Sequence, residues 1–98
     1  MTAFDATCAT LPQKDTTACF TVTAAAHPGM LPRVLEPFAK RGLVPSKLHA
    51  VEQDDGQSAL LIDLQVAQME LETAQKIGNT LNQVFGVNSV LVSAKVAY

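Results

Sequence analysis

The chain has 98 residues, enough for one domain with a modest core, and 48% of them are hydrophobic, which excludes a disordered chain. Seven basic and nine acidic residues give a net charge of −2, and Lys40-Arg41 is the only adjacent basic pair, so binding to a nucleic-acid backbone is not supported. No apolar run approaches the ~20 residues that span a bilayer. The N-terminus lacks the basic and apolar segments of a signal peptide, so we expect a cytoplasmic protein.

The two cysteines, Cys8 and Cys19, are too few for a disulfide scaffold, and their spacing fits no zinc-binding pattern. In a reducing cytosol we expect both to be free thiols. We expect no metal and no cofactor.

Residues 1–17 are rich in Thr and Ala and have no clear periodicity, so we predict a flexible leader followed by one domain over 18–98. The first strand is predicted at about Ala18–Ala25. Along it Phe20, Val22 and Ala24 share one face, and the residues between them are mildly polar. This alternation is typical of a sheet that helices cover on one side.

The segment His27-Pro28-Gly29 joins this strand to a helix-period run, because apolar spacing changes there from two to three and four residues. Pro28 suits the opening of a helix, and Gly29 lets the backbone come close to another group. A helix start offers free N–H groups that can hold a carboxylate, here those of Gly29 and Met30. The alternative is a plain turn without a ligand.

The first helix is predicted over about Gly29–Arg41, with a buried stripe. The members of the stripe are Leu31, Val34, Leu35 and Phe38. Pro37 conflicts with a helix interior because it removes one backbone hydrogen bond, yet the apolar spacing continues past it. Gly42 is predicted to end the helix in a left-handed conformation.

The second strand is predicted at about Val44–Gln53, and Pro45 near its start favours a sheet edge. The turn Asp54-Asp55-Gly56 predicts a hairpin to a third strand at about Gln57–Val66. That strand alternates most clearly in the whole chain, and its inward residues are Leu60, Ile62, Leu64 and Val66.

The second helix is predicted over about Glu70–Phe85, where Gly78 in the apolar stripe would let the backbone approach its neighbours. Gly86 is predicted to cap it. The last strand is predicted at about Val87–Val96. Its inward residues are Val90, Val92, Ala94 and Val96.

The order strand, helix, strand, strand, helix, strand predicts an α+β fold, the ferredoxin-like βαββαβ sandwich. Right-handed crossovers give a four-stranded antiparallel sheet of order 4-1-3-2, with both helices on one face. Part of the other face is apolar, and the second strand has an unpaired edge. Either surface could pair with a second copy of the chain.

No catalytic set is apparent. His49 points outward on the predicted edge strand, and the hairpin turn accounts for Asp54 and Asp55. Asp63, on a central strand, is expected to face the open side and meet Thr21 or a partner chain. The open face lacks the aromatic residues of RNA-binding sheets. The first loop has no arginine to hold a phosphate and no cysteine pair to hold copper, so we predict a protein that is not an enzyme.

Three runs carry a resemblance to a known family: His-Pro-Gly-Met-Leu at 27–31, Phe-Ala-Lys-Arg-Gly-Leu at 38–43 and Phe-Gly-Val-Asn-Ser-Val at 85–90. From about Cys19 to Lys95 the chain resembles an ACT domain, a small ligand-sensing regulatory module. More narrowly, it is similar to the short regulatory subunits of acetohydroxyacid (acetolactate) synthase, which also have His-Pro-Gly at the hinge.

The resemblance implies domains that pair side by side into an eight-stranded sheet and bind an amino acid where they meet. It implies effector contacts from Ala26, His27, Pro28, Gly29, Met30, Leu31 and Val44. The family pattern has asparagine at the positions of Ala26 and Val44. Each lost side-chain hydrogen bond to a ligand would cost about 1–3 kcal/mol.

The implied partners are a second copy, through the edge of the second strand, the open sheet face or both, and the large subunit of acetolactate synthase in branched-chain amino-acid biosynthesis. The implied effector is valine. The alternative is a free-standing ACT module that binds a small amino acid or only mediates dimerisation or partner binding. Neither nucleic acid nor a membrane is an expected partner.

Overall fold

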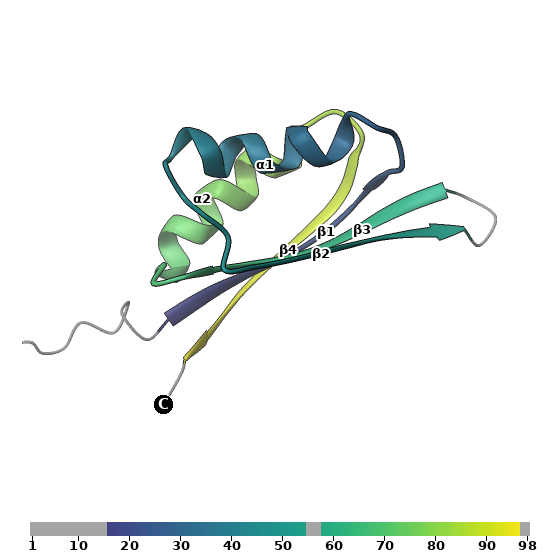
Figure 1. Cartoon of the computed structure of the whole chain (residues 1–98). Helices are drawn as coiled ribbons and strands as arrows, with labels where there is room; N and C mark the ends of the chain where they lie inside the picture. The colour runs from purple at the N-terminus through teal and green to yellow at the C-terminus, as the bar shows by residue number, and fades with distance from the viewer. Residues whose placement is uncertain (1–15, 55–57, 97–98) are drawn as a thin grey trace, which may run out of the picture.

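The computed structural model describes residues 16–54 and 58–96. Its elements, in chain order, are β1 (Thr16–Ala25), α1 (Met30–Lys40), β2 (Lys47–Asp54), β3 (Ser58–Ala67), α2 (Leu71–Asn82) and β4 (Val87–Val96). The strands form one antiparallel sheet of order β2-β3-β1-β4, and both helices lie over the same face of it (Figure 1). The predicted fold and strand order are therefore confirmed.

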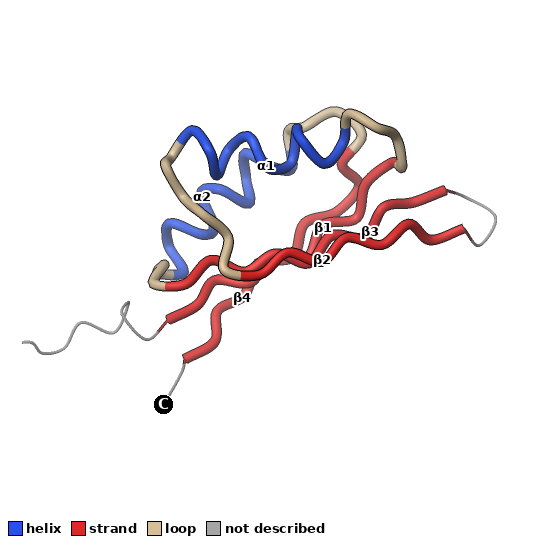
Figure 2. Tube along the Cα trace, viewed as in Figure 1, coloured by secondary structure: helices blue, strands red, loops and turns tan. Residues whose placement is uncertain are grey.

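The core lies between the helices and the two central strands, β1 and β3, and the tube view separates these two layers clearly (Figure 2). Phe20 on β1 meets Phe38 on α1 edge to face, with ring centroids 5.0 Å apart and planes at 85°, a favourable aromatic geometry. Val22 and Ile62 are fully buried beside them. The predicted inward alternation of β1 and β3 is confirmed.

The α1 stripe is buried less evenly than the sequence predicts. Val34 and Phe38 are buried, but Leu31 and Leu35 are only half-buried. Met30, which the predicted stripe omits, is fully buried. The methyl group of Met30 lies so close to Gly86 that a Cβ added to Gly86 would come within 2.5 Å of it. The first helical residue therefore fills the space under the α2–β4 loop.

The end of α1 follows the predicted chemistry. Gly42 has φ +71°. Its N–H donates to the carbonyl of Ala39, and the N–H of Leu43 donates to the carbonyl of Phe38. These two bonds make a Schellman cap, which satisfies carbonyls that a helix end leaves free. Pro37 lies inside the helix, so the apolar spacing outweighs the lost hydrogen bond.

Several predicted boundaries shift. β1 begins at Thr16, two residues before the predicted start. The rest of the predicted leader, with Cys8, lies outside the described residues, as does the tip of the predicted turn at Asp55-Gly56. α2 begins at Leu71 and ends at Asn82, before the predicted Phe85, whose side chain is 88% exposed. The prediction that Gly86 caps this helix is therefore wrong, because Gln83 is the residue at its C-terminal end.

Two predicted inward residues of β4, Ala94 and Val96, are exposed, whereas Val90 and Val92 are half-buried. The reason is that the C-terminal end of β4 extends beyond the helix layer (Figure 1). Gly78 behaves as predicted: a Cβ there would come within 2.6 Å of Val92 Cγ2, so α2 packs against β4 at backbone distance. β2 is confirmed as an edge strand, and all eight of its residues are exposed.

Candidate functional site

The hinge segment, residues 26–29, connects the central strand β1 to α1, the helix above it, as the sequence predicts. The N–H of Ala25 donates to the carbonyl of Gly86 at 2.8 Å, which ties the end of β1, directly before the hinge, to the α2–β4 loop. Both connections therefore lie at one end of the sheet (Figure 1). Any ligand at the hinge would sit where two loops are already fixed to each other.

The side chain and carbonyl of His27 occupy the N–H groups that were expected to face a ligand. The N–H of Gly29 donates to His27 Nδ1 at 3.1 Å, and the N–H of Met30 donates to the His27 carbonyl at 3.0 Å. Pro32 has no N–H. In the described part of the chain, the N–H of Leu31 is thus the first-turn donor that has no partner.

Arg33, which the sequence analysis did not select, also faces this histidine. Its Nη1 lies 3.2 Å from His27 Nε2. A neutral imidazole has one acceptor nitrogen, because the other carries the proton. His27 can therefore accept from Gly29 or from Arg33, but not from both at once. The donor that His27 does not accept from, either the Gly29 N–H or the Arg33 guanidinium, stays available to an anion, together with the N–H of Leu31.

A cavity of about 310 Å³ opens beside the hinge. It is lined by Ala26, His27, Pro28, Glu52 and Leu60. Glu52, near the end of β2, supplies a carboxylate that could pair with an ammonium group, and Leu60 supplies an apolar wall. Glu52 was also missed from the sequence, because only the β2–β3 register places it beside the hinge.

The predicted site residues are brought together in part. Ala26 to Leu31 form one cluster, although the side chain of Met30 is buried in the core and offers only its backbone. Val44 is 83% exposed and follows the opposite end of α1. Eleven helical residues span roughly 16 Å, so Val44 does not meet the hinge of its own chain.

The described residues were also compared with the requirements of a metal site and of a membrane-spanning helix. No three of their His, Cys, Asp and Glu side chains gather closely enough to hold a metal ion. Among the helices of residues 16–54 and 58–96, none has the length and apolarity needed to cross a membrane.

Three solved structures show the same fold. The ACT domain of GTP pyrophosphokinase from Chlorobium tepidum matches 79% of this chain and 96% of its own, with a TM-score of 0.65 and 14% identity. The C-terminal domain of the MgtC protein from Mycobacterium tuberculosis matches 85% of this chain and 90% of its own, with a TM-score of 0.59 and 13% identity. The regulatory subunit of aspartate kinase from Thermus thermophilus matches 85% of this chain and 55% of its own, with a TM-score of 0.55 and 19% identity.

No curated protein matches the sequence. The profile of the ACT-like domain family matches residues 11–97, which is nearly the whole chain and includes the hinge, both helices and all four strands. The chain therefore belongs to the ACT-like domain family, a class of regulatory modules.

Proposed function

We propose that this chain is a non-catalytic regulatory module that binds a small amino acid at the hinge and passes the signal to a partner protein. The hinge cavity carries this proposal. His27, Glu52 and Leu60 line it, and the Gly29 N–H and Arg33 Nη1 contact the His27 ring. An acidic group and an apolar wall in the cavity, with donors for a carboxylate next to His27, suit the ammonium, side chain and carboxylate of an amino acid.

The site becomes larger when two copies pair through β2. An edge strand that pairs with its own copy about a twofold axis must run antiparallel to it. The start of one β2 then lies beside the end of the other. This arrangement brings Val44 of the partner subunit toward Glu52 and the hinge. The separation of Val44 from the hinge within one chain thus fits a site shared by two copies.

The finer proposal is a short regulatory subunit of acetolactate synthase, with the large subunit as partner and valine as effector. It is supported by the resemblance at 27–31, 38–43 and 85–90. The alternative stays open: a free-standing module that binds another small amino acid, or one that only mediates dimerisation. Apolar Ala26 and Val44, in place of the family's asparagines, favour an apolar effector or none.

Calorimetric titration and thermal unfolding with valine, leucine and glycine test effector binding. A bound amino acid at 100 times its dissociation constant should stabilise the fold by about 2.7 kcal/mol.

In Gly29→Asp the new carboxylate would meet Arg33 Nη2, which lies 3.7 Å from a Cβ built at this position, and would compete with the ligand. Both Asp and Asn suit an N-cap, so Gly29→Asn is the uncharged control and should keep binding.

Co-purification with the large subunit of acetolactate synthase separates the finer proposal from the alternative. We expect a complex whose activity changes with this chain and with valine. Absence of a complex, with amino-acid binding retained, would favour the free-standing module. If no amino acid shifts the unfolding temperature, the effector role is wrong and the chain serves as an interaction module.

A further inference from the structure

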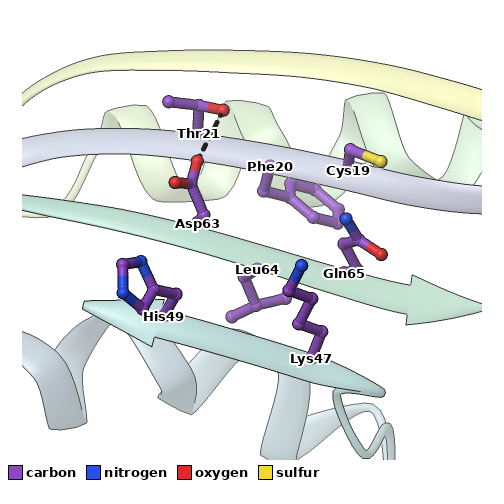
Figure 3. A pocket seen from close by; sticks show the side chains of 8 residues that line it. All are labelled: Cys19, Phe20, Thr21, Lys47, His49, Asp63, Leu64 and Gln65. Carbon is purple, nitrogen blue, oxygen red and sulfur yellow. Dashed lines mark hydrogen bonds between the residues drawn. The ribbon is translucent and has the colours of Figure 1, made fainter.

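The face of the sheet that the helices leave open carries a second pocket, of about 460 Å³, across β2, β3 and β1 (Figure 3). Its lining residues are Cys19, Phe20, Thr21, Lys47, His49, Asp63, Leu64 and Gln65. Phe20 and Leu64 point toward the helices, so their backbone forms the floor, and the other six side chains stand on the open face.

Asp63 is the fixed group of this pocket. It lies on the central strand β3 between Thr21 of β1 and His49 of β2, which are its direct cross-strand neighbours. The Thr21 hydroxyl donates to Asp63 Oδ1 at 3.2 Å, and this bond turns the carboxylate toward β1 (Figure 3). The second carboxylate oxygen, Oδ2, is left for another donor. Aspartate is uncommon within strands, and its place on a central strand is one reason to ask whether Asp63 binds a ligand.

Lys47 supplies the opposite charge. It pairs with Gln65 across β2 and β3, so it is a diagonal neighbour of Asp63 on the same face, a relation that puts the two residues about 7–8 Å apart. Lys47 and Asp63 nevertheless form no ion pair, and the one ion pair of residues 16–54 and 58–96 joins Lys40 to Glu36 on α1. The pocket therefore separates a carboxylate and an ammonium group that have not neutralised each other.

We infer that this pocket binds a small zwitterion, a molecule with one ammonium and one carboxylate group. The ligand's ammonium would donate to Asp63 Oδ2, and its carboxylate would accept from Lys47. His49 and the Gln65 amide stand within the same pocket and can complete the hydrogen bonds. This site is on the opposite face from the hinge cavity, so it is independent of the proposed function.

Two sources share this chemistry, α-amino acids and ω-amino acids, whose charges are farther apart. Glycine and γ-aminobutyrate are the probes, and acetate and methylammonium are the single-charge controls. Each is titrated into the isotope-labelled full chain while backbone amide resonances are followed. We expect saturable shifts at Thr21 and Asp63 with at least one zwitterion. Acetate and methylammonium should bind at least about tenfold more weakly, because each makes only one charged contact. The zwitterion that binds more tightly identifies the source.

Two neutral variants locate the binding. Asp63→Asn keeps an acceptor for Thr21, and Lys47→Gln alters an exposed residue of an edge strand. Each should weaken zwitterion binding at Thr21 about tenfold or more. Lys76→Gln, on exposed α2 surface, should not change it.

Absence of saturable shifts at Thr21 and Asp63 with both zwitterions would overturn the inference. Equal affinity for acetate, or unchanged binding in Lys47→Gln, would also overturn it. Shifts confined to Gly29 and Leu31 would assign the zwitterion to the hinge alone, which supports the proposed function and refutes this second site.

Discussion

The two faces of the sheet come from the same four strands and differ almost completely in character. On the face under the helices, Phe20, Val22 and Ile62 are buried and pack into one core. On the other face, Thr21 and Asp63 are polar and hydrogen-bonded to each other. Because adjacent residues of a strand point to opposite sides, each strand contributes to both faces at once. The covered face determines whether the chain folds, and the open face is free to serve recognition.

The open face is not uniformly polar. Leu91 on β4 is 68% exposed and lies across from Thr21, while Val51 on β2 is 39% exposed and lies across from Leu61. Leu91 is thus the cross-strand neighbour of one pocket residue, and Val51 lies two residues along β2 from another, His49. The open face therefore combines a polar pocket with exposed apolar side chains.

Substitutions of Phe20 and of its neighbour Thr21 should differ most in their effect on stability. Phe20→Ala removes a fully buried ring and its contact with Phe38, and we expect a loss of about 3–5 kcal/mol in the free energy of unfolding. Thr21→Ala changes the other face and should cost about 1 kcal/mol. Urea denaturation of both variants measures the difference. Equal losses would contradict the assignment of the core to one face.

A smaller effect distinguishes two glycines with positive φ. Gly86→Ala would strain a residue at φ +96° and press on Met30, so we expect a loss of about 2–3 kcal/mol. Gly42→Ala, at φ +71° with no atom within 4 Å of the new Cβ, should lose only about 1 kcal/mol. Thermal unfolding compares the two variants. A greater loss for Gly42→Ala would show that Gly86 and Met30 do not pack tightly under the α2–β4 loop.

The contact of α2 with β4 predicts a compensating pair. Gly78→Ala gains about 1 kcal/mol of helix propensity, but its Cβ would crowd Val92, at a cost of about 1–3 kcal/mol. We expect a net loss of about 1 kcal/mol. The double variant Gly78→Ala, Val92→Ala should be more stable than the sum of the two single changes predicts, as a double-mutant cycle in urea would show. Simple additivity would mean that the two residues do not touch.

A substitution on the open face should change the stability least. Thr21→Val keeps the shape of the side chain and removes the hydroxyl that bonds Asp63, which is exposed. The free energy of unfolding should fall by less than about 1 kcal/mol. Zwitterion binding in the open-face pocket should weaken, because the Asp63 carboxylate is no longer held. A large loss of stability would mean that the bond serves the fold.

Most of the fold follows from the sequence because its signals are local. The alternation of β3, the Schellman cap at Gly42 and the close approach at Gly78 each depend on residue types at fixed spacings. Burial at the margins was less predictable, since Ala94 and Val96 have the right spacing but no helix above them. Gln68 has φ +59° without being glycine, so no residue type marks the turn before α2.

The candidate site was predicted only in part. The hinge was visible because His27-Pro28-Gly29 separates two periodicities. Arg33 and Glu52 were missed, since one depends on a side-chain contact with His27 and the other on the register of β2 against β3. The open-face pocket likewise depends on register, which aligns Lys47, His49 and Asp63 across two strands. Pairing partners of this kind are not contained in residue spacing.

The proposed sharing of the hinge site by two copies joined at β2 can be tested by the mass of the chain in solution. Leu48 on β2 and Leu71 on α2 are matched residues, 42% and 41% exposed. Light scattering should show a dimer for the wild type and for Leu71→Glu, and a monomer for Leu48→Glu that no longer binds the amino acid. A monomeric wild type that still binds it, or dissociation by Leu71→Glu in place of Leu48→Glu, would contradict the account.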